Sequence, residues 1–173
     1  SGDIAREILK ENLPISLYLL DLNEEMLLEG RKRLKKVKNV KYFIGNAEKL
    51  NFEDNFFDKY TISFCLRNVT EYLLSIKEAY RVLKPGGKYC CLEFSTPKSS
   101  LVSSSYKIYK SKILPLLGEI VAKDKNAYNY LSESIDLFPS QEELSKNLSD
   151  CGFTKVKTIN LFNGIVAIHT CYK

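Results

Sequence analysis

The sequence predicts an α/β fold built on a doubly wound, mostly parallel sheet. Short apolar runs alternate with helix-like segments along much of the chain, several of these runs end in polar residues, and the last two form a hairpin pattern. The chain of 173 residues is long enough for one domain with a substantial core. Its 45% hydrophobic and 27% charged residues are typical of globular proteins.

The N-terminal part predicts two helices and two strands in alternation. Apolar residues repeat at helical spacing over residues 4–9, and the apolar run 17–20, ending in Asp21, is typical of a buried parallel strand. Asn23 is suited to cap the next helix, which carries acidic residues in its first turn. The inward stripe of that helix is predicted to be Met26, Leu27, Gly30, Leu34 and Val37. The run 40–44 predicts a second strand.

The middle of the chain predicts a strand over 60–64, a helix, and a strand over 89–94. Thr70 is suited to cap this helix, and Pro85-Gly86-Gly87 is expected to stop it, because Pro and Gly follow helix ends. The side chains expected to face inward from the helix are Leu73, Ile76, Ala79, Tyr80 and Leu83.

The C-terminal part begins with residues 98–134, which read as helix without strands. A second helix is expected over 139–151, ended by Gly152. Residues 155–160 and 165–172 read as strands joined by a turn at Asn163-Gly164, which predicts an antiparallel hairpin. We expect this hairpin to add an antiparallel edge strand to the sheet.

Charge and cysteine usage exclude several classes of protein. The net charge of +5 is mild and the lysines are mostly scattered, which argues against a nucleic-acid partner. The five cysteines are odd in number and show no CxxC spacing, so we expect neither disulfides nor a zinc site, and a reducing compartment. No other residues suggest a metal, and no apolar run approaches the length of a membrane span.

Polar residues follow the predicted strand over 60–64. In an open α/β sheet ligands bind outside the carboxyl ends of the strands, which places Ser63, Arg67 and Asn68 where chemistry is expected. The alternative is a role as surface loop residues or helix caps. The single histidine, His169, lies in an alternating strand. A structural role is the favoured interpretation there, and a catalytic base is the alternative.

Two further positions fit a nucleotide-binding α/β unit. Asp21 follows Gly2 by about the spacing at which a carboxylate accepts hydrogen bonds from ribose hydroxyls, and Gly2 is a candidate for the last glycine of a glycine-rich loop. A helix cap explains Asp21 equally well. Asn46, with Ala47 beside it, could border an adenine ring, or could simply form a turn.

One basic segment and one apolar segment each have two possible interpretations. The basic run within residues 31–41 predicts a solvated helix face, with an anionic lipid surface as the alternative. The apolar and aromatic stripe over 106–121 predicts either a helix packed on the core or a lid over a hydrophobic substrate.

These motifs together resemble the ubiquinone/menaquinone biosynthesis C-methyltransferases, a family of class I S-adenosylmethionine-dependent methyltransferases. The Leu-Lys-Pro-Gly-Gly turn at 83–87 is shared with methyltransferases in general. More particular to the family are Leu66-Arg67-Asn68-Val69, Leu92-Glu93-Phe94-Ser95 and Pro115-Leu116-Leu117-Gly118. The resemblance covers essentially the whole chain. Two departures are Ser1, where the family usually has Thr, and Cys65, where members often carry Gly.

The resemblance implies a role for each matching residue and S-adenosylmethionine as the cofactor. Arg67 and Asn68 would face the reacting centre, where Arg67 could stabilise a phenolate and a water on both residues, or His169, could relay its proton. The residues implied in cofactor binding are Ser1 and Gly2 in the loop around the methionine part, Asp21 at the ribose, Asn46 and Ala47 at the adenine, and Ser63 at the strand end.

The resemblance also predicts the domain organisation. Residues 1–173 would be a single Rossmann-like methyltransferase domain that lacks the N-terminal helices and the first strand of the family. Residues 98–134 would be a helical substrate lid, with Tyr109, Ile113 and Leu117 against the polyprenyl tail.

The implied activity is C-methylation of a polyprenyl benzoquinol in ubiquinone biosynthesis. The alternatives are a demethylmenaquinone methyltransferase and a non-catalytic scaffold in a quinone-biosynthesis complex. The implied partners are the quinol, a peripheral membrane surface, a multi-enzyme complex and a second copy of the chain. The implied location is the matrix side of the mitochondrial inner membrane in a eukaryote, or the cytoplasm in a bacterium.

Overall fold

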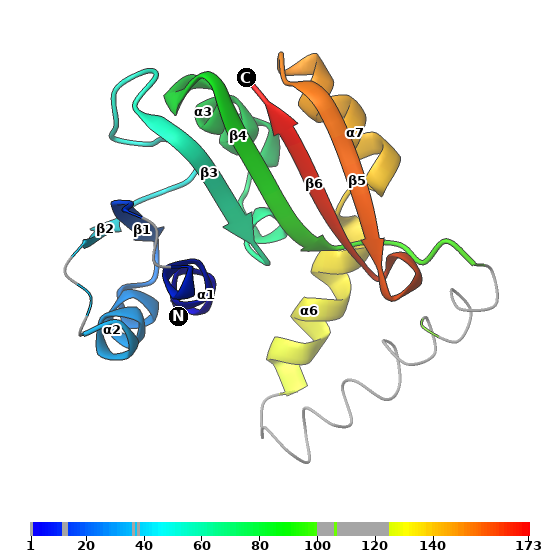
Figure 1. The fold of residues 1–173 in the computed structure, drawn as a ribbon. Coiled ribbons are helices and arrows are strands. Elements are labelled where there is room, and N and C mark those ends of the chain that lie inside the picture. The colour runs from blue at the N-terminus through cyan, green and yellow to red at the C-terminus, as the bar shows by residue number, and fades with distance from the viewer. Residues whose placement is uncertain (1, 12–13, 36, 38, 100–105, 107–124) are drawn as a thin grey trace. The chain divides into compact units, whose positions relative to one another are not determined.

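The computed structural model describes residues 2–11, 14–35, 37, 39–99, 106 and 125–173. Figure 1 shows helices and strands in both of the compact units into which the chain divides, Ser1–Glu53 and Asp54–Lys173. The predicted α/β class is confirmed, because parallel strand pairs and helices occur in each unit. None of the described helices is long and apolar enough to cross a membrane.

The N-terminal unit contains α1 (Asp3–Lys10), β1 (Leu17–Asp21), α2 (Glu24–Arg33) and β2 (Val40–Ile44). The strands pair in parallel, with Leu17 opposite Val40 and Asp21 opposite Ile44. The predicted cap of α2 is confirmed: the Asn23 side chain accepts the N–H groups of Glu25 and Met26 at 2.8 and 3.4 Å.

The inward stripe of α2 was predicted only in part. Leu27, Gly30 and Leu34 are buried, but Met26 is 42% exposed and Val37 lies beyond the end of the helix. The helix ends early because Leu34 leaves helical geometry, with φ of −104° and ψ of 15°. The predicted parallel strand over residues 17–20 is confirmed, but it is half-buried along its length and not buried as expected.

The C-terminal unit is built on a four-stranded sheet in the order β3-β4-β6-β5. Its strands β3 and β4 pair in parallel, while β6 is antiparallel to both β4 and β5. The elements of this unit are β3 (Phe57–Ser63), η1 (Leu66–Asn68), α3 (Tyr72–Val82), β4 (Leu83–Phe94), α6 (Lys125–Leu137), α7 (Gln141–Asp150), β5 (Thr154–Leu161), η4 (Phe162–Gly164) and β6 (Val166–Tyr172).

The predicted C-terminal hairpin is confirmed, and its strand β5 is the expected edge strand, antiparallel to its neighbour β6. The strand antiparallel to β4 is β6, which lies inside the sheet, and β5 forms the edge. Burial explains this order: Ala167 and Cys171 of β6 are buried, whereas β5 carries exposed lysines that suit an edge strand.

The helix and strand in the middle of the chain begin and end elsewhere than predicted. The cap of α3 is Glu71 and not Thr70, and Leu73 is 39% exposed. Leu83 already has extended geometry and starts β4, so α3 ends at Val82, before the Pro-Gly-Gly turn. That turn lies within β4 as an irregularity, where the register changes between Phe57 and Lys59 of β3.

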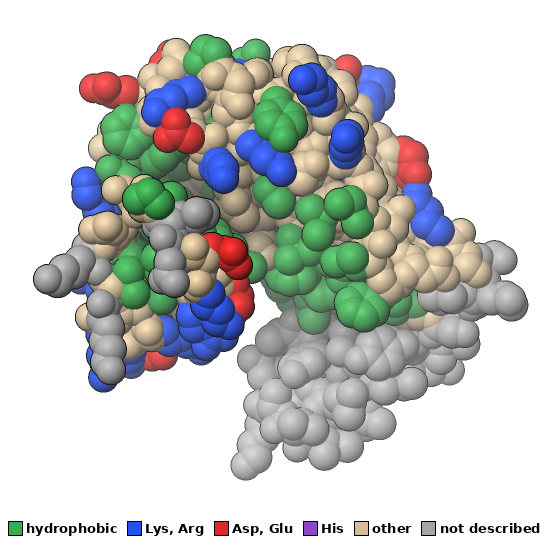
Figure 2. Space-filling model, viewed as in Figure 1, with side chains coloured by type: hydrophobic (Ala, Val, Ile, Leu, Met, Phe, Trp, Pro, Cys, Tyr) green, Lys and Arg blue, Asp and Glu red, His purple; other side chains and the backbone are tan. Residues whose placement is uncertain are grey.

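The core of this unit lies between the sheet and two helices. Figure 1 shows α3 and α7 on the same side of the sheet, and their buried residues Ile76, Ala79, Leu144 and Leu148 pack in one cluster with strand residues that include Tyr89. Alternate residues of β4 and β6, such as Phe94 and Ile168, are only half-buried. In Figure 2 hydrophobic side chains gather over these strands.

Candidate active site

The chain leaves the carboxyl end of β3 through a turn held by backbone bonding and burial. Phe64 has a positive φ of 51°, and its N–H donates to the carbonyl of Leu92 at 2.9 Å. Leu66 is 1% exposed and anchors η1 in the core. Arg67 and Asn68 therefore follow the strand in a defined conformation.

Arg67 forms a buried ion pair with Glu93 of β4. Arg67 Nη1 lies 2.7 Å from Glu93 Oε1, and the Arg67 backbone N–H donates to Glu93 Oε2 at 3.4 Å. The two side chains are 9% and 2% exposed. Burial raises the pKa of the Glu93 carboxyl above its ordinary value of 4.5, although the Arg67 charge and two backbone N–H groups oppose this shift.

Two aromatic rings adjoin this ion pair. The Arg67 guanidinium carbon lies 5.2 Å from the centre of the Phe94 ring, a distance at which the ring face attracts a cation. The Phe64 ring lies 4.9 Å from the Phe94 ring, and Phe64 is 39% exposed. The result is a partly exposed apolar surface next to a guanidinium, which suits an aromatic ligand that carries an ionisable hydroxyl.

Asn68 is oriented from two directions. Its side-chain amide donates to the carbonyl of Phe64 at 3.5 Å, and the Tyr130 hydroxyl of α6 donates to Asn68 Oδ1 at 3.3 Å. These contacts connect α6 to the turn after β3. Ser63, the last residue of β3, is half-buried, so the structure brings Ser63, Arg67 and Asn68 to one strand end.

Asp21 is the last residue of β1, at the carboxyl end of a parallel strand. Its Oδ1 accepts the Asn23 N–H at 2.9 Å. This bond closes the turn before α2, whose cap is Asn23 and not Asp21, and it uses one of the two carboxylate oxygens, so a ribose-binding role of Asp21 stays a prediction. Gly2 precedes α1 with φ of 79°, and a Cβ there would lie 3.1 Å from Gly30 Cα, which favours glycine.

Asn46 occupies the predicted turn after β2. Its Oδ1 accepts the Glu48 N–H at 2.9 Å, and its amide donates to Glu48 Oε2 at 2.9 Å. The turn interpretation is thereby confirmed, and Ala47 beside it is half-buried. A contact of Asn46 and Ala47 with adenine stays a prediction.

His169 is 1% exposed and lies under α7, where its Nε2 is 3.1 Å from the carbonyl oxygen of Gln141. Its Nδ1 is buried and has no hydrogen-bond partner among the described residues. Burial lowers the pKa of the imidazole from its ordinary value of 6.5. These observations favour the structural role, and catalysis by His169 stays a prediction.

Because His169 is buried in its neutral form, acid should destabilise the protein through this residue. The folded state binds the proton less tightly than the unfolded state, so the free energy of unfolding should fall as the pH drops below 6.5, by up to about 1.4 kcal/mol per pH unit. The His169→Gln variant should lack this component in urea titrations from pH 7.5 to 5. Equal pH slopes in both proteins would contradict the prediction. Glu93, whose pKa is raised, contributes with the opposite sign and is present in both.

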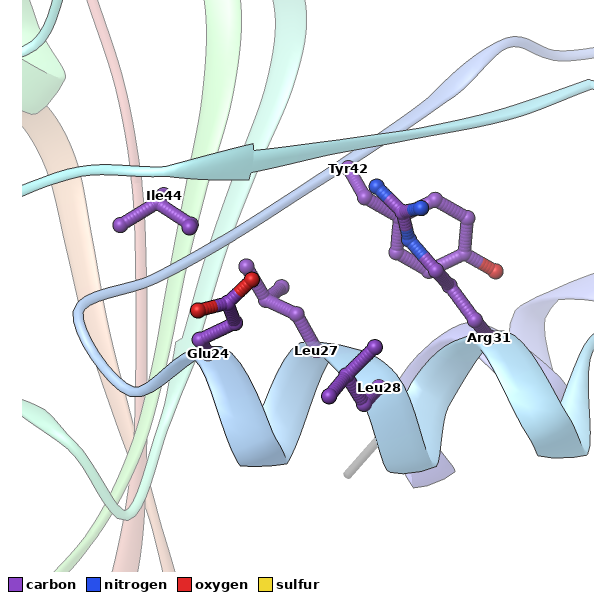
Figure 3. Close-up of a pocket in the computed structure, with 6 residues that line it drawn as sticks. All are labelled: Glu24, Leu27, Leu28, Arg31, Tyr42 and Ile44. Carbon is purple, nitrogen blue, oxygen red and sulfur yellow. The ribbon is translucent and has the colours of Figure 1, made fainter.

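Several predicted residues lie outside the described part of the chain, namely Ser1 and the substrate residues Tyr109, Ile113 and Leu117. Of the predicted lid over 98–134, the structure describes residues 98, 99 and 106 and the first part of α6. Figure 3 shows a small cavity between α2 and β2, in which Arg31 lies 5.0 Å from the centre of the Tyr42 ring. Its lining residues are Glu24, Leu27, Leu28, Arg31, Tyr42 and Ile44, none of which is a predicted site residue.

Sequence reasoning missed Glu93 as a site residue. The available signal was a lone carboxylate in the apolar run 89–94, at a position that alternates with Tyr89 and Cys91 and therefore shares their face of the sheet. A charge on a buried face is retained only with a partner, which pointed to a buried cation nearby.

The fold is that of S-adenosylmethionine-dependent methyltransferases. A methyltransferase from Thermotoga maritima, described as a possible histamine N-methyltransferase, superimposes with a TM-score of 0.64 at 22% identity over 91% of this chain and 72% of its own. A Haemonchus contortus phosphoethanolamine N-methyltransferase, solved with S-adenosylhomocysteine, gives a TM-score of 0.73 at 17% identity over 99% of this chain and 46% of its own.

The chain belongs to the ubiE/COQ5 methyltransferase family, whose model matches residues 1–173. The ubiquinone/menaquinone biosynthesis C-methyltransferases of Rickettsia bellii and Rickettsia prowazekii are each 48% identical over 180 aligned residues, which cover 100% of this chain and 73% of theirs. The protein is an S-adenosylmethionine-dependent C-methyltransferase.

Proposed function

We propose that the protein methylates a ring carbon of a polyprenyl benzoquinol in ubiquinone biosynthesis. Its bacterial relatives carry the name of ubiquinone and menaquinone biosynthesis. The observation that carries the proposal is the Arg67 guanidinium beside the partly exposed Phe64–Phe94 pair, because a quinol presents both an aromatic face and an ionisable hydroxyl.

The chemistry requires an electron-rich ring carbon. Ionisation of a quinol hydroxyl pushes negative charge onto the adjacent carbon, but a phenol has a pKa of about 10 in water. Arg67 would lower this pKa by stabilising the phenolate, and a water on Arg67 and Asn68 would accept the proton. S-adenosylmethionine supplies the methyl group from a sulfonium, whose sulfur keeps the electron pair of the broken bond. The methylated ring carbon then loses its own proton and aromaticity returns.

The cofactor roles are proposed on the strand ends and the turn. Asp21 Oδ1 accepts the Asn23 N–H, so the other carboxylate oxygen is available to a ribose hydroxyl. We propose that Asp21 binds the ribose, that Asn46 and Ala47 border the adenine, and that Gly2 and Ser63 lie along the cofactor. The described residues contain no grouping of three His, Cys, Asp or Glu side chains that could hold a metal ion.

The partners follow from the acceptor. A polyprenyl tail would bring the enzyme to a membrane surface, and Tyr109, Ile113 and Leu117 are proposed to contact this tail. We also propose, from the family resemblance, that the protein forms a homodimer and takes part in a quinone-biosynthesis complex. The proposed location is the cytoplasm in a bacterium like those of the relatives, or the matrix side of the mitochondrial inner membrane in a eukaryote.

The test is transfer of a labelled methyl group from S-adenosylmethionine to two short-tailed acceptors, a demethylated benzoquinol and a demethylated naphthoquinol. The complete gene product is used under reducing conditions. Product from the benzoquinol at the higher kcat/KM supports the proposal. Preference for the naphthoquinol would assign the menaquinone pathway, and cofactor binding without product from either acceptor would overturn a quinol substrate.

Asp21→Asn should raise the KM for S-adenosylmethionine by about 10-fold or more, because an amide loses the charge-assisted bonds to ribose hydroxyls. The Asn side chain keeps an oxygen for the Asn23 N–H, so the start of α2 should be preserved. The matched control is Asp58→Asn, which breaks only an exposed ion pair with Lys84. Cofactor titration by calorimetry checks the result, and unchanged affinity in Asp21→Asn would remove Asp21 from the cofactor site.

A further inference from the structure

Glu93 is buried at a position that would ordinarily hold an apolar side chain. It is 1% exposed, on the sheet face that it shares with Tyr89 and Cys91, both also 1% exposed. A carboxylate in such surroundings costs free energy unless charged and hydrogen-bonded partners compensate it. Its presence therefore needs a reason beyond packing.

The Glu93 carboxylate forms hydrogen bonds with its own strand and with Arg67. Its Oε1 accepts the Phe94 N–H at 2.9 Å, which fixes the carboxylate to its own strand, and also lies 2.7 Å from Arg67 Nη1. Its Oε2 accepts the Arg67 backbone N–H at 3.4 Å. Glu93 thus contacts both the backbone and the side chain of Arg67, and its charge-assisted bond to Nη1 restricts the position of the guanidinium.

The contact with Glu93 leaves one N–H donor of the Arg67 guanidinium without a partner among the described residues. Arg67 Nε is buried and has no hydrogen-bond partner within the described part of the protein. A buried donor left without a partner is rare and calls for an explanation, such as an acceptor that arrives with a ligand. Phe94 covers the guanidinium from another direction, 5.2 Å from the ring centre.

We infer that Glu93 is a positioning residue for methyl transfer, which holds the Arg67 guanidinium in the orientation that stabilises the phenolate of the acceptor. The inference rests on the proposed function, since it acts through Arg67. In the hydrogen bonds given above, the Glu93 carboxylate contacts Arg67 and the backbone N–H of Phe94. A purely structural ion pair is the competing explanation, because buried pairs are often replaceable by apolar residues.

The two explanations differ in how the losses combine. If Glu93 acts only through Arg67, Glu93→Gln should lower kcat for the labelled-methyl reaction by about 10- to 100-fold, as outer-shell partners of a functional group do. The KM for S-adenosylmethionine should stay within about twofold, since Arg67 is not proposed to bind the cofactor. Glu93→Asp should recover part of the loss. The double variant Arg67→Ala/Glu93→Gln should lose no more kcat than Arg67→Ala alone.

The matched control is Glu78→Gln, which alters an Arg–Glu pair of the same unit, formed with Arg81, in which the Glu78 and Arg81 side chains are 20% and 31% exposed. Its kcat should be unchanged. The double variant leaves no orphaned buried charge and keeps the test decisive if a single variant folds poorly. Full kcat in Glu93→Gln, or losses that multiply in the double variant, would overturn the inference. Full activity in Arg67→Ala would instead overturn the proposed role of Arg67, so the two failures are distinguishable.

Discussion

Replacing Arg67 by Ala is expected to lower kcat for quinol methylation by about 100- to 1000-fold, the effect of removing a preorganised group that stabilises developing negative charge. The KM for S-adenosylmethionine should change little. Without the guanidinium the acceptor hydroxyl keeps a pKa near that of a free phenol, so the remaining activity should rise steeply with pH.

The same substitution should also destabilise the fold. It leaves the Glu93 carboxylate buried without its counter-ion, which costs about 3–5 kcal/mol in comparable pairs. The pKa of Glu93, already raised by burial, should rise further. The folded state then binds a proton more tightly than the unfolded state, so part of the lost stability should return as the pH is lowered.

Arg81→Ala is the matched control for Arg67→Ala. Arg81 also pairs with carboxylates, Glu78 and Asp54, at 2.7 Å, but its side chain is 31% exposed and Asp54 is 68% exposed. We expect a loss of about 1 kcal/mol and an unchanged kcat. Urea unfolding and initial-rate assays check both variants. Equal effects of the two substitutions on kcat would show that the buried guanidinium has no special part in the reaction.

Local sequence signals predicted most elements of the fold. The strand over 40–44, the capped start of α2 at Asn23 and the hairpin at Asn163-Gly164 are each determined by short-range patterns. The order of β5 and β6 in the sheet is set by which strand finds buried neighbours, which no local pattern contains. The start of β4 at Leu83 likewise depends on pairing with Phe57, far away in the sequence.

The sequence likewise predicted some residues of the candidate site and not others. Arg67 and Asn68 were included in the candidate site because polar residues directly after a buried strand mark a ligand-binding edge, and their roles stay predictions. Glu93 was missed because its meaning comes from a partner 26 residues away, and the sequence shows only a charge in an apolar run. His169 shows the reverse case: its residue type indicates chemistry, while burial beneath α7 favours structure.

A large loss of stability without a change of charge is expected from Leu148→Ala in α7. Leu148 is 0% exposed and packs in the cluster that joins α3 and α7 to the sheet. Removing its buried methyl groups leaves a cavity, and such substitutions cost about 2–5 kcal/mol. The variant should unfold at a lower urea concentration, with an unchanged dependence on urea if the unfolding remains two-state.

Leu137→Ala provides the matched control, because Leu137 ends α6 and is 87% exposed. The same deletion there should change the free energy of unfolding by no more than about 0.5 kcal/mol. Below the unfolding transition Leu148→Ala should keep its kcat, since Leu148 belongs to the buried core cluster and is none of the proposed site residues. If the two leucines gave equal losses, the packing of α7 against the sheet would not be the source of stability described here. A fall in kcat for folded Leu148→Ala would instead show that α7 influences the carboxyl end of β4, where Glu93 holds Arg67.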